Sequence, residues 1–363
     1  MVADLNSPYC GTMPAAAQPA IGSTPVSSTR KKTPIKKDAS CSFSDIRAAL
    51  ESKGVSRKTQ DLIIGSWRKT TRKQYDSYVK QWLHYCKGKD DPFKPTMKTV
   101  LHFLSELYEK GLSYNAIGIA RSAVSGFLKL ISGIDISHDC LLKRFMKGVF
   151  NERPALPKYN KIWDVRVVLE FLTHVNTDNL LSLSGKLCMM FLLLSGQRCQ
   201  TIHLVCLEDV NICDKKVTIN MPHLLKTSKP GNHQAPIVFE SYDLDSQLCI
   251  VQTFLQYIER TKSLRSTNKL LISTIKPHGA ASKQTIGRWI KLIMLRAGVH
   301  KSFTPHSTRT ASTSMAKMCG IPLSAIVKSA GWKNARTFAK YYNKPIISND
   351  CARNTLQDIL EAK

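Results

Sequence analysis

Acidic residues are scarce in this 363-residue chain. It has 26 Asp and Glu against 53 Lys and Arg, which gives a formal net charge of +27 at neutral pH. A surface this positive repels itself unless a polyanion neutralises it, and nucleic acid is the commonest such partner. An anionic membrane surface is a weaker candidate, because no basic amphipathic helix stands out. The charge balance therefore favours nucleic acid as the partner.

Long apolar runs are also missing. The longest, residues 187–194, is too short to cross a bilayer, for which about 20 apolar residues are needed. The N-terminus lacks a charged start followed by an apolar run, so we expect neither a secretory signal nor a membrane partner. Hydrophobic residues still make up 43% of the chain, which is enough for ordinary buried cores in two domains.

Paired cysteine motifs are absent, although the chain has 11 cysteines. None forms a C-x-x-C pair, and Cys199, Cys206 and Cys213 recur every seven residues with no His partner at metal spacing. The odd number of cysteines also argues against a secreted disulfide framework. We therefore expect an intracellular protein with mostly reduced thiols, no metal site and no cofactor.

Composition and apolar period divide the chain into five segments. The first is rich in Pro, Ser, Ala and Thr, and its basic run between Arg30 and Lys37 is a candidate nuclear-import signal or DNA-contacting arm. A stretch with two prolines and no period marks a linker. The expected segments are a disordered basic tail (1–42), a helical domain (43–150), the linker (151–161), a second domain (162–345) and a C-terminal tail helix (346–363).

The helical domain shows apolar stripes separated by basic residues. One stripe comprises Val100, Phe103, Leu104 and Leu107, and the spacing is that of a helix with one buried face. The basic residues lie largely off such stripes, so we predict a DNA-binding face. Its members are Arg57, Lys58, Arg68, Lys69, Arg72, Lys73 and Arg121, with Lys80 and Lys129 in the same pattern.

The second domain mixes helices with one hairpin. Residues 180–194 are apolar and helix-like and end at Ser195–Gly196, and 217–221 with 235–240 read as two strands around a Gly/Pro turn. Further helices are expected at about 245–263, 282–297, 306–319 and 322–330. The predicted fold is therefore mainly α, with a small antiparallel sheet in an α+β second domain.

Near the C-terminus, His306 and Arg309 are three residues apart at a predicted helix start, where both side chains and the helix N-terminus suit a phosphate. Taken alone, H-x-x-R is a common coincidence. Other residues follow or precede it at fixed spacing. They are Gly331–Trp332, the adjacent Tyr341 and Tyr342, the upstream Arg198 after Ser195–Gly196–Gln197, and Lys226 in the predicted hairpin turn.

In order and spacing, these residues resemble the tyrosine recombinase, or phage integrase, family, over roughly residues 43–345. The stretches SGQRCQTIHL and TFAKYYNKP look most like recombinases of DIRS-type, Ngaro-like and Crypton-like mobile elements. The resemblance implies a SAM-like helical core-binding domain followed by a catalytic domain. It also implies a site-specific recombinase that cleaves and rejoins double-stranded DNA through a 3′-phosphotyrosine, without metal or ATP, as a homo-tetramer on paired sites in the nucleus.

The resemblance also implies a role for each residue. Arg198 and Arg309 clamp the scissile phosphate, His306 hydrogen-bonds it, and Lys226 protonates the departing 5′ oxygen. Trp332 occupies the second His position of the family, where its indole N–H donates but cannot shuttle a proton. Thr201 stands where many members have Glu, which alters the support of Arg198.

Several alternatives remain at this stage. Lys229 lies near the same turn as Lys226, although Lys226–Thr227 matches the family better. A spacing of nine residues after Trp332 selects Tyr341 as the nucleophile, whereas the pattern over 338–345 selects Tyr342, which we prefer. The alternative functions are a non-catalytic DNA-binding protein derived from a mobile-element recombinase and, third, a type IB topoisomerase.

Overall fold

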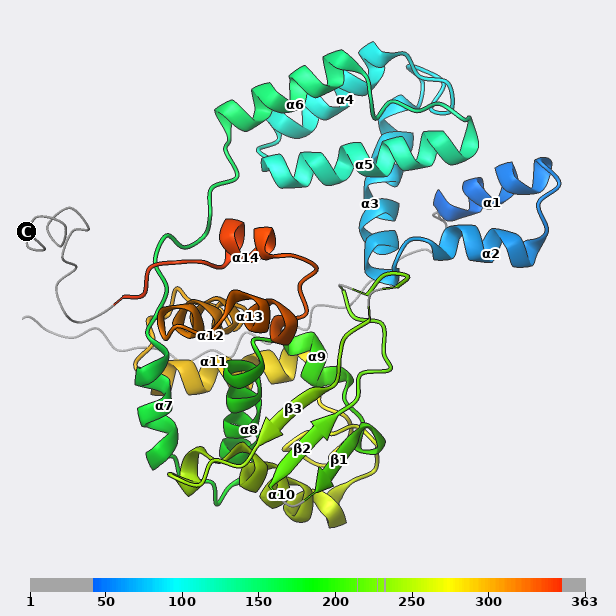
Figure 1. The fold of residues 1–363 in the computed structure, drawn as a ribbon. Helices are drawn as coiled ribbons and strands as arrows, with labels where there is room; N and C mark the ends of the chain where they lie inside the picture. The colour runs from blue at the N-terminus through cyan, green and yellow to red at the C-terminus, as the bar shows by residue number, and fades with distance from the viewer. Residues whose placement is uncertain (1–41, 214, 227, 232, 348–363) are drawn as a thin grey trace, which may run out of the picture. The chain divides into compact units, whose positions relative to one another are not determined.

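The computed structural model describes residues 42–347 except 214, 227 and 232, and the chain divides between Ala155 and Leu156 into two compact units (Figure 1). This division falls within the segment 151–161 in which the linker is predicted. The predicted disordered tail over 1–42 and the predicted tail helix with Leu356, Ile359 and Leu360 lie outside the described residues, apart from the few at their edges.

The first unit is entirely helical in its described part. At its centre, the apolar side of α5 (Tyr114–Ile131) is fully buried, and α3 (Lys69–Cys86) packs against this helix. Trp82 of α3 has no exposed surface and packs edge-on against Phe103 of the next helix. The predicted stripe from Val100 to Leu107 is buried on α4. The helices are α1 (Ser42–Ser52), α2 (Arg57–Gly65), α3 (Lys69–Cys86), α4 (Met97–Glu109), α5 (Tyr114–Ile131) and α6 (Cys140–Glu152).

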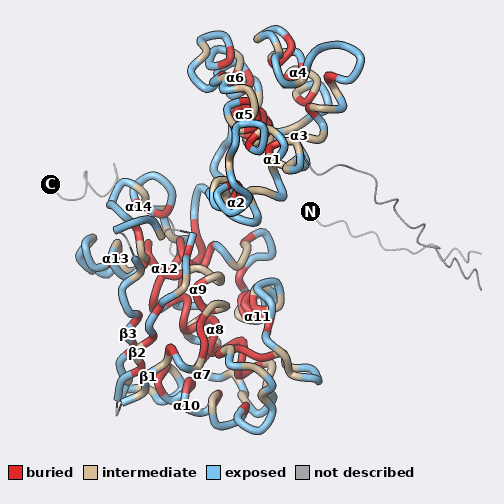
Figure 2. Tube along the Cα trace, turned by 90° about the vertical axis from the view of Figure 1, so that its right-hand side faces the viewer, coloured by how far each residue is buried: buried red, intermediate tan, exposed pale blue. Residues whose placement is uncertain are grey.

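The second unit is built around α8 (Leu180–Ser195), which is buried on nearly every side (Figure 2). A helix that is apolar all round needs neighbours on all faces, and α10, α11 and α12 pack against it. The helices are α7 (Val165–His174), α8, α9 (Cys199–Leu204), α10 (Ile250–Thr261), α11 (Lys283–Arg296), α12 (Ser307–Met318), α13 (Leu323–Ala330) and α14 (Ala335–Tyr341), with short 3₁₀ turns at Leu207–Asp209 (η1), Ser246–Leu248 (η2) and Lys262–Leu264 (η3).

A small antiparallel sheet lies beside α8 and α10 (Figure 1). Its order is β1 (Val210–Cys213), β2 (Lys216–Ile219) and β3 (Ile237–Glu240). The predicted hairpin is confirmed by β2 and β3, which pair with Val217 opposite Phe239. Phe239 then packs on Phe191 of α8 and Phe254 of α10, which joins the sheet to the core. The sequence did not indicate β1, because its four residues alternate only weakly between partly buried and exposed.

The segment after α14 returns to the start of the second unit. Ile162 donates its N–H to Pro345 O at 2.8 Å and accepts from Ile347 N at 2.7 Å. This parallel bridge between Ile162 and Ile346 holds the segment after α14 against the segment that precedes α7. The mainly helical fold with a small antiparallel sheet agrees with the prediction, and none of the helices in the described ranges is long and apolar enough to cross a membrane.

Candidate active site

The end of α8 positions the first arginine. Gly196 caps the helix in the left-handed conformation, with φ of 61°, and a β-carbon there would lie 3.0 Å from Thr313 Cγ2. Glycine is therefore needed both for the backbone angle and for the close approach to α12. Arg198 follows as the half-buried N-cap residue of α9. From there its charge lowers the pKa values of His306 and Arg309, which places it at the same site.

Arg309 occupies the centre of the site and has no exposed surface. Its terminal nitrogens donate to Gly196 O and Ala330 O, each at 2.8 Å. These carbonyls lie at the C-terminal ends of α8 and α13, where helix dipoles leave partial negative charge. Burial and the charge of Arg198 lower the pKa of Arg309 to about 9, so the guanidinium stays protonated at neutral pH.

Two aromatic rings cover the Arg309 guanidinium. Its central carbon lies 4.4 Å from the centre of the Trp332 ring and 5.3 Å from that of Tyr342, and the two rings are 4.6 Å apart. Cation–π contacts of this kind contribute on the order of 1–2 kcal/mol when water is excluded. Tyr342 also favours the charged guanidinium and so partly offsets the lowering of the Arg309 pKa. The fold thus brings one predicted nucleophile directly to one predicted phosphate clamp.

The adjacent tyrosines differ in exposure. Tyr342 is 9% exposed and packs on Trp332, with its ring centre 6.3 Å from that of His306. Ser314 of α12 donates to the backbone carbonyl of Tyr342 at 2.6 Å and fixes this residue against the helix that carries Arg309. Tyr341 is 58% exposed and lies beside Lys340. Of the two, Tyr342 is the one that contacts Arg309.

His306 is the N-cap residue that precedes α12, and part of its surface is open to solvent. Protein packed around the ring, together with the positive charges of Arg198, Arg309, Lys226 and Lys283, lowers the pKa of His306 to about 4. The imidazole is therefore neutral at pH 7 in the free protein. An anion at this site would offset the surrounding positive charge and favour the protonated ring.

We expect the His306 resonance to titrate near pH 4 in the free protein and at a higher pH with duplex DNA bound, because phosphate oxygens stabilise the imidazolium. NMR of the ring protons, assigned by comparison with His306→Gln, measures both values. The folded pKa lies below the unfolded value of 6.5, so stability contributed by this group is present above about pH 6.5 and is lost as the pH falls toward 4. Titration near 6.5 in the free protein would contradict this electrostatic account.

Two lysines add to the positive field. Lys226 is exposed in the loop between β2 and β3, and its positive charge contributes to the lowered pKa of His306. Lys283, the first residue of α11, also lowers the pKa of His306, and sequence reasoning missed it. A signal existed, since a cation in the first turn of a helix opposes the helix dipole. Such a local violation is typical of functional positions.

A polar network supports the turn that carries Arg198, and it was also missed. Thr201 donates to Gln197 Oε1 at 3.0 Å, while Gln197 Nε2 donates to Ser329 O at 2.6 Å and to Gln234 Oε1 at 3.2 Å. Thr201, in the position where many family members have Glu, therefore acts on Gln197. The network joins α9 to the C-terminal end of α13 and to the segment before β3, three places that no sequence pattern connects.

Gly331→Ala is expected to destabilise the protein and disturb this network. Gly331 has φ of 66°, and a β-carbon would lie 2.1 Å from Gln234 Oε1. The backbone angle alone costs about 1–2 kcal/mol for a residue with a side chain, and displacing Gln234 adds to this. We expect the midpoint of urea unfolding to fall and DNA cleavage to slow.

Gly320→Ala is the matched control, because Gly320 has φ of 80° and open space around its α-carbon. It shares the backbone penalty without touching Gln234, so it should lose stability but keep cleavage. Equal cleavage by the two variants, at equal folded fractions, would show that the Gln234 contact has no part in the site.

The basic residues predicted to bind DNA lie on the first unit, and each is at least partly exposed. Arg57 and Lys58 begin α2, Arg68 caps α3, and Arg121 lies on α5. The remaining members on α3 are Lys69, Arg72 and Lys73. By contrast, Lys129 Nζ is paired with Asp135 Oδ2 at 2.6 Å, and Lys80 is paired with Asp76 at 3.0 Å.

Comparison with known proteins decides the family. Residues 159–345 of the 363-residue chain, more than half, match the family described as the phage integrase family. The chain belongs to the phage integrase family. This confirms the sequence-based identification as a tyrosine recombinase, an enzyme class that breaks and rejoins DNA.

Individual relatives agree with this membership. The chain is 27% identical over 278 residues to tyrosine recombinase XerD of Staphylococcus saprophyticus, covering 64% of this chain and 89% of that protein. The Tn1549 transposon integrase bound to transposon right-end DNA is similar in fold, with a TM-score of 0.56, 14% identity, and 88% of this chain and 98% of that chain covered. XerH in a pre-cleavage complex gives a TM-score of 0.56 at 14% identity, covering 82% and 81%.

Proposed function

We propose that this phage integrase family member is a site-specific recombinase that forms a 3′-phosphotyrosine on Tyr342. The observation that carries this assignment is the contact of Tyr342 with Arg309, inside a cluster that also holds Trp332 and His306. Phosphoryl transfer asks an enzyme mainly for positioning and charge neutralisation. A phenol held against a guanidinium places the nucleophile beside the positive charge that neutralises the phosphate.

The proposed reaction assigns one task to each side chain. Tyr342 Oη bonds to the scissile phosphorus, the bond from phosphorus to the 5′ oxygen breaks, and Lys226 gives that oxygen a proton. Arg198 and Arg309 neutralise the phosphate, because guanidinium is ionised at neutral pH and matches the geometry of phosphate. The Tyr342 proton is released to solvent during attack, aided by the positive field. The new ester conserves bond energy, so the reverse attack by a 5′ hydroxyl rejoins DNA without ATP.

Unpaired donors in the site support an anionic ligand. Within the described part of the chain, Arg309 Nε and Trp332 Nε1 are buried and have no hydrogen-bond partner. Buried N–H groups nearly always find an acceptor, and an unpaired one costs about 1–3 kcal/mol. Both groups suit a phosphate oxygen. Since Arg309 has no exposed surface, its contact with phosphate requires the covering Tyr342 ring to move toward the DNA.

Covalent capture on random-sequence DNA tests the function. The full chain is incubated with a library of duplexes, denatured, and the DNA that remains attached is sequenced. A recombinase yields attached DNA enriched in one sequence, and it joins two duplexes that contain this sequence. Attachment to many sequences with relaxation of a supercoiled plasmid would indicate a topoisomerase instead. Binding without attachment would indicate a non-catalytic DNA-binding protein.

Nonspecific DNA affinity should fall steeply with salt, because the basic residues of the first unit release counterions from the duplex. A protein with about 6–10 phosphate contacts loses about 10³–10⁵-fold between 50 and 200 mM salt. Fluorescence anisotropy across this range measures the slope, and Lys73→Ala should reduce it by about one. Lys129→Ala should change it less, since Asp135 already neutralises that lysine. A flat salt dependence would remove the electrostatic argument.

We also propose the assembly, origin and location of the enzyme. The lambda integrase dimer bound to a core site, a fold match with a TM-score of 0.51, supports action as an oligomer, and we propose a homo-tetramer on paired DNA sites. The SGQRCQTIHL and TFAKYYNKP stretches support a DIRS-type, Ngaro-like or Crypton-like mobile element as the source. The basic run between Arg30 and Lys37 supports nuclear import.

A further inference from the structure

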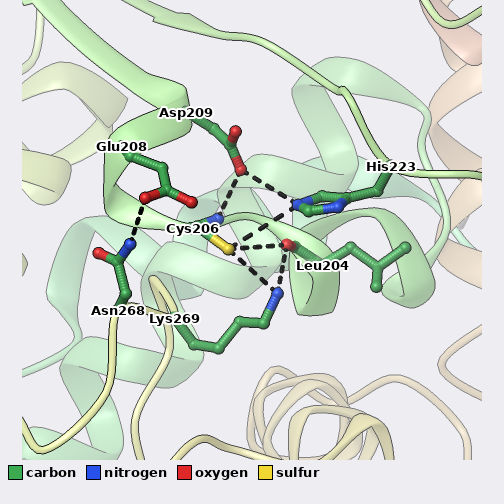
Figure 3. Close-up of polar contacts among 7 residues, drawn as sticks. All are labelled: Leu204, Cys206, Glu208, Asp209, His223, Asn268 and Lys269. Atoms are coloured by element: carbon green, nitrogen blue, oxygen red, sulfur yellow. Dashed lines mark hydrogen bonds and ion pairs between the residues drawn. The ribbon is translucent and has the colours of Figure 1, made fainter.

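A mixed cluster of Cys206, Asp209 and His223 lies outside the catalytic residues (Figure 3). Cys206 precedes η1 and Asp209 ends it, while His223 comes from the loop between β2 and β3. One potential ligand atom from each residue lies within 4.8 Å of the others. No sequence motif indicates this set, because His223 is 17 residues beyond Cys206 and only the sheet brings it back.

The distances fit a tetrahedral cation of the zinc class. His223 Nε2 lies 3.3 Å from Asp209 Oδ2 and 3.8 Å from Cys206 Sγ. Typical zinc bonds of about 2.0–2.1 Å to nitrogen and oxygen and about 2.3 Å to sulfur give tetrahedral edges of about 3.4 and 3.6 Å. The two distances from His223 are therefore within about 0.2 Å of those of a zinc site, and the third, between the sulfur of Cys206 and a carboxylate oxygen of Asp209, is at most 4.8 Å.

Two of the three donors are held in place by the backbone. Cys206 N donates to Asp209 Oδ2 at 2.9 Å, and Asp209 N donates to Cys206 O at 3.1 Å. Cys206 also forms an antiparallel bridge with Lys269. Cys206 and Asp209 are buried, whereas the His223 side chain is 33% exposed. Cys206 and Asp209 are thus a preformed pair of ligands. His223 is the third ligand, and its partly exposed side chain leaves a path by which a cation can enter.

One neighbouring charge opposes a cation. Lys269 Nζ lies 3.1 Å from Cys206 Sγ, but it also donates to Leu204 O at 2.8 Å (Figure 3). The lysine can therefore keep the carbonyl contact while the sulfur turns to a metal. Its positive charge should weaken cation binding without preventing it. Removing this charge should therefore tighten binding, whereas removing a ligand should weaken it.

We propose that Cys206, Asp209 and His223 bind a divalent cation of the zinc class, with water in the fourth position. Binding replaces the thiol proton of Cys206, which is released to solvent. His223 lies three residues before Lys226, so the cation would anchor the loop that carries this lysine. Cation binding stands independently of the recombinase assignment, whereas an effect on DNA cleavage rests on the proposed function.

Cobalt(II) titration of the full, chelator-treated chain, without DNA, tests the site. We expect one cobalt per chain with a sulfur-to-cobalt charge-transfer band and the strong ligand-field absorption of four-coordination, both abolished by added Zn²⁺. Cys206→Ser should abolish the charge-transfer band, His223→Ala should weaken binding, and Lys269→Met should tighten it. Cys213→Ser is the matched control, because this exposed thiol lies on β1 outside the cluster, and it should leave the spectrum unchanged.

Three outcomes would overturn the proposal: no band in the wild-type chain, a band that persists in Cys206→Ser, or unchanged affinity in His223→Ala. The exposed position of His223 makes its variant the safer one for folding, and circular dichroism checks both. Covalent capture of DNA with and without Zn²⁺ then measures the coupling through Lys226. Cobalt binding without any covalent capture would sink the proposed function and leave the metal site standing.

Discussion

Tyr342→Phe is expected to abolish covalent capture of DNA completely. The substitution removes the hydroxyl that forms the phosphotyrosine, while the ring keeps its contacts with Trp332 and Arg309. Folding should be nearly unchanged, since the substitution removes one hydroxyl and keeps the nearly buried ring in place. The measurement is the yield of protein–DNA adduct on a nicked suicide substrate built from the captured sequence, compared at equal concentrations of folded protein.

Tyr341→Phe is the matched control, with the same chemical change one residue earlier. Tyr341 is 58% exposed and neighbours Lys340, so its hydroxyl contributes little to the site and the adduct should persist. Peptide mapping of the adduct gives an independent answer. An adduct on Tyr341 would reverse the assignment and keep the mechanism, whereas an adduct on neither tyrosine would refute the mechanism.

The two arginines should separate catalysis from folding. Arg198→Ala should lower cleavage by about 10³-fold or more, the scale of an arginine that stabilises a transferring phosphoryl group. Arg198 is only half-buried and caps α9 without a side-chain cap bond, so stability and DNA binding should change little. Single-turnover cleavage, urea unfolding and anisotropy measure the three quantities on one protein preparation.

Arg309→Ala should lose cleavage and also stability. Its guanidinium makes two charge-assisted hydrogen bonds to helix-end carbonyls, and its loss leaves both unpaired in a buried space, at a cost on the order of 3 kcal/mol or more. This differs from the sequence-based expectation, in which both arginines were only phosphate clamps. If Arg309→Ala is as stable as Arg198→Ala, the structural role of Arg309 is wrong.

Local pattern was enough for most of the fold. The apolar run of α8, its Gly196 cap and the pairing of β2 with β3 follow from side-chain period and turn chemistry. β1 was missed because a four-residue strand with weak alternation carries little signal. Its place is set by its partner, β2, and not by its own residues.

The site shows the same division. Spacing singled out Arg198, Lys226, His306, Arg309, Trp332 and the tyrosine pair, because chemistry restricts which residue types a phosphoryl-transfer site uses. Spacing did not single out Lys283, Gln197 or Gln234, whose roles arise from contacts between distant segments. The cluster of Cys206 with His223 was missed for the same reason, since metal-site motifs detect only ligands that are near in sequence.

By itself, then, the sequence determined the partner class, the family and the residue types of the site, because charge, period and motif order are properties of the chain alone. The tertiary structure decided which side chains are buried and which meet. It covered Arg309 with Tyr342 and left Tyr341 at the surface, since neighbouring residues at the end of a helix point in directions about 100° apart and only packing selects between them.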